Sequence, residues 1–427
     1  MIMKRILVIS WFYPPINSSE GLVTFKLLNN SRYEYDVYTQ KGTTVFSYGK
    51  NVALENHPNV HPIYASSKTI VDWKDEAIEF FREHHDEYDC VMTRSMPQES
   101  HIIGATIKKE FPEVYWIASF GDPIKANPYQ HLDCSLHSYH GMDNLINRDK
   151  GIKYRLSLSR FVFSRYWYHK HKYAVKIRRE LAKIEDTALE MCDCVIYNNE
   201  SQQKFMSTTD EILKKSVVIP HSYDESFYPE KDPEPHGKIR FLFVGHLDAI
   251  RTAYPLFEAL KSLKESDENL ADRVQFDFYG DMGDGDLLFW AKNGLGDVVK
   301  IHHNVPYLES LKLMRNADWN IHVDGNIRLV CDENIFFAAK VADYFGAGAG
   351  IFAFTMNSGA TYDYLTNAGE LVLSYSAMEI RQNLYYIIYK GMTVTPNKEY
   401  ISKFDARNVA KKFDDEVIKP FLEKRTK

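Results

Sequence analysis

The sequence lacks any run of about 18 or more uncharged apolar residues, which argues against a membrane-spanning helix. The apolar residues 6–9 are too few for the core of a signal peptide. Cysteines are scarce: the five present lack zinc-ligand spacing, which favours reduced cysteines and a cytoplasmic location. There is also no Walker A loop, Gly-x-Ser-x-Gly elbow or His-Glu-x-x-His motif, so the commonest kinase-like, hydrolase and zinc-protease interpretations are removed.

The sequence has no excess of positive charge, and its net charge of −6 argues against general nucleic-acid binding. The charge is uneven, however. Residues 148–183 are rich in lysine, arginine and aromatic residues, with Asp149 and Glu180 as the only acids. Such a stretch fits peripheral contact with an anionic membrane surface, or a long helix that packs its aromatic side chains inward.

The chain is long enough for two domains, and both halves show the same alternation of strands and helices. In the first half, short apolar strands such as residues 6–10 and 194–197 alternate with helical segments. A charged, proline-rich segment follows at 224–238, and the pattern restarts at the strand 239–244. We therefore predict an α/β protein in which two Rossmann-like domains, 1–223 and 239–395, face each other across a cleft. A terminal helical segment, 396–427, completes the chain.

The region 300–350 contains the best candidate for a binding site. A buried strand, residues 319–323, ends in Asp324, and after a loop a helix begins near Lys340 and contains Asp343. Open α/β sheets bind ligands at the carboxyl ends of their strands, and helix N-termini favour phosphate. The spacing therefore predicts a nucleotide-sugar pocket.

Several segments, in this order, resemble the retaining GT-B glycosyltransferases often called family four. They are the opening strand and Pro-Pro loop ending at Gly21, followed by residues 117–123, 191–200, 218–224, 243–251 and 340–348. The resemblance implies two facing Rossmann-like domains, with a C-terminal helix that returns to the N-terminal domain. It also implies retaining transfer of a sugar from a nucleotide-diphosphate donor to a hydroxyl acceptor, with no metal and no further cofactor.

The implied partners are a nucleotide sugar and a glycan or lipid-linked acceptor, as in the synthesis of a bacterial surface polysaccharide. An enzyme of this kind would be cytoplasmic, or peripheral on the inner face of the cell membrane through residues 148–183. Two alternatives remain open: a nucleotide-sugar epimerase with the same fold, and a catalytically silent scaffold module.

The sequence departs from the family pattern at one acid. The family often has two glutamates eight residues apart in the donor site, the first contacting the sugar and the second the ribose. Asp343 matches the second, whereas the first falls on Ile335. Because Asp332 and Glu333 lie close by, a shifted loop could supply the missing carboxylate.

The candidate residues each allow a second interpretation. Arg251 is placed to clamp a diphosphate and stabilise the leaving group, or is an exposed arginine near a helix start. Lys340 donates to the same phosphates or is a solvated charge, and Asp343 accepts from ribose or complements the helix dipole. Asp122 orients an acceptor hydroxyl or caps an Asp-Pro turn, and Gly21 allows close approach to phosphate or only a turn.

The acidic, glycine-rich segment 280–286 satisfies neither the dinucleotide nor the calcium-loop spacing, so we expect no metal site there. The predicted catalytic residues are Arg251, Asp122 and Glu333, and the predicted donor-binding residues are Gly21, Gly245, His246, Asp324, Lys340, Asp343 and Tyr344.

Overall fold

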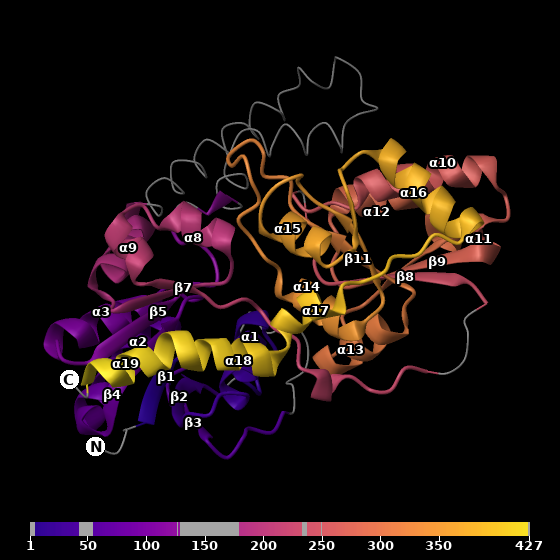
Figure 1. Ribbon diagram of the computed structural model, residues 1–427. Coiled ribbons are helices and arrows are strands. Elements are labelled where there is room, and N and C mark those ends of the chain that lie inside the picture. Colours follow the sequence, from indigo (N-terminus) through magenta and orange to yellow (C-terminus); the bar gives the residue numbers. More distant parts are fainter. Residues whose placement is uncertain are drawn as a thin grey trace.

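The computed structural model describes residues 5–41, 54–125, 127–128, 179–232, 237–248 and 250–425. The basic aromatic stretch 148–183 lies outside these ranges, except for residues 179–183. The described part contains two separate parallel sheets, of seven and six strands, which confirms the predicted α/β class (Figure 1). None of its helices combines the length and apolar character needed to cross a bilayer.

The N-terminal sheet has the strand order β3-β2-β1-β4-β5-β6-β7, with every neighbouring pair parallel. Its strands are β1 (Arg5–Ile9), β2 (Tyr35–Gln40), β3 (Val60–Ala65), β4 (Tyr88–Arg94), β5 (Tyr115–Ser119), β6 (Cys194–Tyr197) and β7 (Ser216–Val218). Side chains of β1 alternate between two cores: Ile6 and Val8 pack on one face, and Leu7 and Ile9 on the other. Both faces are therefore buried, as the continuous apolar strands predict.

Helices cover both faces of this sheet. They are α1 (Ser19–Asn29), α2 (Ile70–His84), η1 (His85–Glu87), α3 (Glu99–Glu110), an unlabelled helix over 179–191, α8 (Glu200–Met206) and α9 (Asp210–Lys214). Helix α1 begins where the Ser18 side chain accepts a hydrogen bond from the Gly21 amide, 3.1 Å away, and so satisfies one of the unpaired amides of the first turn. The start of α1 is thereby held just beyond the carboxyl end of β1.

The C-terminal sheet has the order β10-β9-β8-β11-β12-β13 and is also parallel throughout. Its strands are β8 (Ile239–Val244), β9 (Val274–Tyr279), β10 (Val299–His302), β11 (Trp319–Val323), β12 (Gly350–Phe354) and β13 (Leu371–Leu373). Along β8, Phe241 and Phe243 pack in one core, while Leu242 faces the other.

Helices flank this second sheet as well. They are α10 (Tyr254–Ser266), α11 (Leu270–Arg273), α12 (Asp284–Lys292), η3 (Leu295–Asp297), α13 (Tyr307–Asn316), α14 (Ala339–Ala347), α15 (Ala360–Asn367) and α16 (Ala377–Lys390). Helix α14 ends at Gly348, whose φ of 73° is a left-handed conformation that favours glycine. The predicted boundary at residue 395 falls between α16 and the next helix.

The charged, proline-rich segment 224–238, which the sequence predicts to be a linker between the domains, is partly packed. It begins with η2 (Glu225–Phe227), and the next residue, Tyr228, is buried and donates from its hydroxyl to the Asp343 carbonyl at 2.7 Å. The aromatic residues in this stretch explain the difference, because burying a tyrosine against α14 removes apolar surface from water.

The chain then crosses back to the N-terminal half. The return passage consists of α17 (Lys398–Ile401), η4 (Ser402–Phe404), α18 (Ala406–Phe413), the π-helical η5 (Asp414–Ile418) and α19 (Lys419–Arg425). It lies beside the segment that leads from the first domain to the second: the Tyr223 amide donates to the Phe404 carbonyl (2.9 Å), and the Ala406 amide donates to the Tyr223 carbonyl (2.8 Å). Figure 1 shows α18 and α19, in yellow, lying along the N-terminal domain, which confirms the predicted returning helix.

Each sheet reverses its winding direction next to its first strand. In the first sheet β1 lies between β2 and β4, and in the second β8 lies between β9 and β11. Ligands of open parallel sheets bind in the crevice beyond such a reversal, at the carboxyl ends of the strands. The loops after β1, β5, β8 and β11 are therefore the places to look for a site.

Candidate functional site

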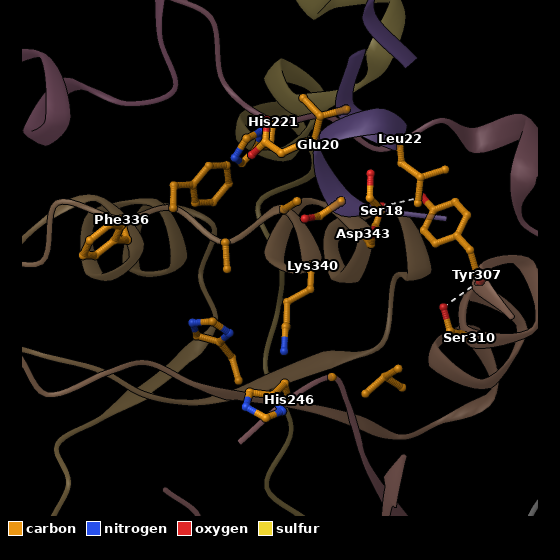
Figure 2. Close-up of a pocket in the computed structure, with 18 of the residues that line it drawn as sticks. Ser18, Glu20, Leu22, His221, His246, Tyr307, Ser310, Phe336, Lys340 and Asp343 are labelled. Carbon is orange, nitrogen blue, oxygen red and sulfur yellow. Dashed lines mark hydrogen bonds between the residues drawn. The ribbon is translucent and has the colours of Figure 1, made fainter. Parts of the chain in front are cut away.

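A cavity of about 440 Å³ lies between the two domains at these strand ends (Figure 2). The N-terminal domain lines it with residues 17–20, 22, 23, 26 and 121–122, together with His221. The C-terminal domain contributes residues 244–251, 304–314, 322–324 and 336–343 in part. Figure 2 shows Lys340 near the centre, pointing toward His246, with Glu20 and His221 on the opposite side. The predicted pocket is therefore formed by both domains.

Lys340, in the first turn of α14, is the central cation of the C-terminal wall. Its Nζ is buried without a hydrogen-bond partner among the described residues, and it lies 4.5 Å from the centroid of the Phe243 ring. Burial and the nearby Arg251 charge lower the pKa of Lys340 to about 7, although Asp324 acts in the opposite direction. A buried ammonium that lines a cavity is poised to gain an anionic ligand.

Gly245 leaves the space that this ammonium occupies. The residue follows β8 with a φ of 142°, and a Cβ atom added there would lie 2.2 Å from Lys340 Nζ. Any side chain at this position would clash, and an L-residue would be strained at this φ. The glycine thus leaves room for the Lys340 ammonium, and Gly245 itself lines the cavity.

Arg251 lines the same wall from the loop that precedes α10. Its backbone amide donates to Asp248 Oδ1 at 2.8 Å, which fixes the turn. Its charge lowers the pKa of both Lys340, on the same wall, and Asp122, on the opposite wall. Arg251 thus lines the cavity, and its role toward a leaving diphosphate stays a prediction.

Asp324 and His246 complete the C-terminal wall. Asp324 is buried at the end of β11, where Asn334 donates to its Oδ2 (2.6 Å) and His322 Nε2 lies 3.4 Å from its Oδ1. His246 is exposed, with its Nδ1 3.9 Å from Asp281 Oδ2. Asp324 therefore brings a fixed carboxylate to the cavity, and His246 lies at its mouth.

The N-terminal wall presents two carboxyl groups, Glu20 and Asp122. Arg94 Nη2 donates to Glu20 Oε2 at 3.0 Å, and Arg94 Nη1 donates to the Ser119 hydroxyl at 2.7 Å. Burial and the charge of Glu20 raise the pKa of Asp122 to about 7, although Arg251 opposes the shift. A carboxyl group with a pKa near neutrality can both accept and return a proton at physiological pH.

Asp343 is already engaged by protein groups. Lys26 Nζ and the Tyr307 hydroxyl both donate to its Oδ1, each at 3.0 Å. Lys26 belongs to α1 of the N-terminal domain, so this buried ion pair joins the two domains. The predicted ribose acceptor thus lines the cavity, with one of its two oxygens occupied.

The structure places three predicted residues outside the lining of the cavity. Glu333 pairs with Lys204 Nζ at 3.0 Å, and the buried Ile335 occupies the family's glutamate position, so the loop does not supply the missing carboxylate. Tyr344 lies in the core of the C-terminal domain and donates from its hydroxyl to Ile321 at 3.0 Å, because it faces the sheet rather than the cavity. Gly21 packs against the backbone of residues 12 and 13, while its neighbours Glu20 and Leu22 line the cavity.

Sequence reasoning missed several lining residues: Glu20, Lys26, His221, Tyr307 and His322. One signal was available for Lys26, because a lysine inside the apolar run 22–28 must be buried and needs a partner. His221 is buried, with its ring stacked on Phe337 at 5.7 Å, and burial lowers the pKa of His221 to about 3. It is therefore neutral at physiological pH and adds no cation to the N-terminal wall.

Comparison with solved structures decides the fold. Sucrose-phosphate synthase from Thermosynechococcus elongatus superposes with a TM-score of 0.61 at 14% identity, covering 98% of this chain and all of that one. HepE of Anabaena, solved with UDP-glucose, gives a TM-score of 0.63 at 12% identity, covering 97% of this chain and 100% of that one. The chain has the GT-B fold. A further GT-B structure, a trehalose-phosphate synthase from Burkholderia xenovorans, gives 0.59 at 11% identity, over 96% of this chain and 99% of that one.

No protein-family model and no curated protein sequence matches this GT-B chain. Within the described ranges, no group of three or more His, Cys, Asp or Glu residues is placed to hold a metal ion. The chemistry of the site must accordingly be argued from its own side chains.

Proposed function

We propose that this protein is a glycosyltransferase that uses a nucleotide-diphosphate sugar. One observation carries the proposal: the cavity has cations on its C-terminal wall, Arg251 and Lys340, and carboxyl groups on its N-terminal wall, Glu20 and Asp122. A diphosphate needs cations to neutralise its charge, as on the C-terminal wall. An acceptor hydroxyl needs a carboxyl group to take its proton, as on the N-terminal wall. The GT-B fold, whose neighbour HepE was solved with UDP-glucose, supports the same assignment.

In this proposal the C-terminal wall binds the donor and the N-terminal wall binds the acceptor. Arg251 and Lys340 neutralise the nucleotide diphosphate, whose negative charge grows as the sugar departs, so they stabilise the transition state more than the ground state. Asp324 accepts from a hydroxyl of the donor sugar, in place of the glutamate that Ile335 replaces. Asp122 orients the acceptor hydroxyl and receives its proton.

The finer assignments rest on the resemblance of the sequence to family four. They are transfer with retention of the anomeric configuration, no requirement for a metal, and a lipid-linked or growing glycan of a bacterial surface polysaccharide as acceptor. Among the described residues of the N-terminal wall, the charged cation is Lys26, and it is paired with Asp343. This wall suits a hydroxyl-bearing acceptor.

Incubation with a panel of nucleotide sugars, without acceptor, tests the proposal. A transferase should hydrolyse its own donor slowly, and the rate should be unchanged by EDTA. Inversion of the sugar at C2 without hydrolysis would indicate an epimerase instead. Neither binding nor turnover of any donor would indicate a scaffold.

Replacing Asp343 with asparagine should weaken nucleotide binding by about 1–3 kcal/mol, because a ribose hydroxyl would lose a charged acceptor. Asparagine preserves the shape of the side chain and can still accept from Tyr307, which limits the disturbance left around Lys26. Titration calorimetry with the preferred nucleoside diphosphate measures the effect. Unchanged affinity in the folded variant would remove Asp343 from the nucleotide site.

We also propose that residues 148–183 attach the protein to the inner face of the cell membrane. The mixture of cations and aromatic residues supports this location, since each basic residue near an anionic surface contributes about 1 kcal/mol. In liposome flotation, binding should need anionic lipid and should weaken as salt screens the charges. Replacing Lys170, Lys172 and Lys176 with glutamate should abolish flotation and leave donor hydrolysis unchanged. Failure of the wild type to float at low salt would show that the stretch has no membrane role.

A further inference from the structure

Lys26 is a lysine in an apolar environment. It lies in α1 between Phe25 and Leu27, both of which pack in the core of the N-terminal domain, and its side chain is only 1% exposed. Its Nζ reaches across the domain boundary to Asp343 Oδ1 at 3.0 Å and to the Tyr307 hydroxyl at 3.4 Å, and it lies 5.9 Å from the centroid of the Tyr307 ring. Burying an ammonium costs free energy unless it is paired and hydrogen-bonded, so Lys26 depends on Asp343 and Tyr307 for its buried position.

The three groups form a closed cluster around one oxygen. The Tyr307 hydroxyl also donates to Asp343 Oδ1, while Tyr228 donates to the backbone carbonyl of the same aspartate at 2.7 Å. Burial and the Asp343 charge raise the pKa of Tyr307 well above its usual value, so its hydroxyl keeps its proton and remains a donor. Every hydrogen bond that the described residues make with the Asp343 side chain thus falls on Oδ1, which leaves Oδ2 for a ligand.

The position of this cluster connects it to the cavity. Lys26, Tyr307 and Asp343 all line the space between the domains, whereas a second cross-domain pair, Lys204 with Glu333, lies outside it. The Lys204 side chain is 77% exposed, so its ion pair is screened by water. Among the described residues, two lysines therefore form ion pairs with acids of the other domain, and one of these pairs lies inside the candidate site.

We propose that Lys26 is a positioning residue of the donor site, through which the N-terminal domain completes the ribose subsite of the C-terminal domain. This inference rests on the proposed function. Lys26 and Tyr307 hold Oδ1, which fixes the carboxylate plane and presents Oδ2 to the 2′ and 3′ hydroxyls of the nucleotide. Recognition of ribose consequently requires the two domains to be together, since neither domain alone holds both the acid and its ammonium.

The test measures ribose recognition rather than overall affinity. UDP, GDP, ADP and CDP are titrated into the wild type by calorimetry, and the tightest binder is compared with its 2′,3′-dideoxy counterpart. The wild type should prefer the ribonucleotide by about tenfold or more, because the dideoxy form leaves the carboxylate without its partner. In Lys26→Met this preference should fall to about twofold or less, while the dideoxy compound should bind both proteins similarly.

Three comparison variants control for structure. Lys26→Arg keeps a donor cation and should keep most of the ribose preference. Lys204→Met removes the other cross-domain lysine and should change nothing. If Lys26→Met fails to show a wild-type thermal transition, Tyr307→Phe replaces it, because that change removes a donor to the same Oδ1 and should also reduce the preference.

The outcomes separate the two claims. A wild type that binds a nucleotide without preferring ribose, or a Lys26→Met protein that keeps the preference, overturns the role of Lys26 and leaves the proposed function intact. Tighter binding of the ribonucleotide by Lys26→Met also overturns it, since the lysine would then compete with ribose for Asp343. A wild type that binds none of the four nucleotides overturns the proposed function itself.

Discussion

Replacing Arg251 with alanine should lower turnover by about 10²–10³-fold, the range found when a preorganised stabilising donor is removed from an active site. The charge that Arg251 faces grows as the bond to the sugar breaks, so the loss should fall mainly on kcat. Binding of the intact nucleotide sugar should change much less, because Lys340 and Gly245, which line the same cavity, would still be available to the diphosphate.

Steady-state kinetics at saturating donor, together with titration of the unreacted donor, separate the two effects. Arg328→Ala is a matched control, because Arg328 is exposed, donates to Asn357 at 2.6 Å and does not line the cavity. Its kinetics should equal those of the wild type. An Arg251→Ala protein with normal turnover at saturating donor would disprove the assigned role.

Replacing Asp122 with asparagine should lower kcat/KM by about 10²–10⁴-fold, the usual contribution of general acid–base catalysis. Because the pKa of Asp122 is about 7, its base form predominates only above neutral pH. The wild-type rate should therefore fall as the pH drops through 7, and this acidic limb should disappear in Asp122→Asn. Asp332→Asn, an exposed acid outside the cavity, is the control and should retain the limb.

Lys340 should produce a basic limb in the pH profile of kcat/KM. Its pKa of about 7 means that the free protein loses this charge as the pH rises, so kcat/KM should fall above neutrality. A bound diphosphate keeps the ammonium charged, and the basic limb should therefore be absent from kcat. An Asp122→Asn profile that retains the acidic limb would assign that ionisation to another group.

Local pattern was sufficient to predict much of the fold. The strands Cys194–Tyr197 and Ile239–Val244 match their predicted ranges because a short apolar run buried on both faces has few alternative structures. The predicted return of the terminal helices is also confirmed, because their apolar stripe packs against β1. Helix ends were predicted less accurately: the sequence predicts a helix over 253–263, whereas α10 extends to Ser266.

Residue pairs distant in the sequence could not be predicted in the same way. Lys26 and Asp343 are separated by 317 positions, and only the packing of one domain on the other brings them together. Tyr344 follows Asp343 directly, but the helical turn directs it to Ile321 in the core. Glu333 lies outside the cavity, whereas Asp324, which Asn334 holds across the loop, lines it.

The returning helices also affect the order in which the protein can fold during synthesis. Phe413, Val417 and Phe421 cover the face of the first sheet that carries Ile6 and Val8. These strands leave the ribosome roughly four hundred residues before the side chains that cover them. One apolar face of the N-terminal domain thus stays open to water and to chaperones until residues 413–421 have been made. Of the two domains, the one whose strands come earlier in the sequence is completed after the other.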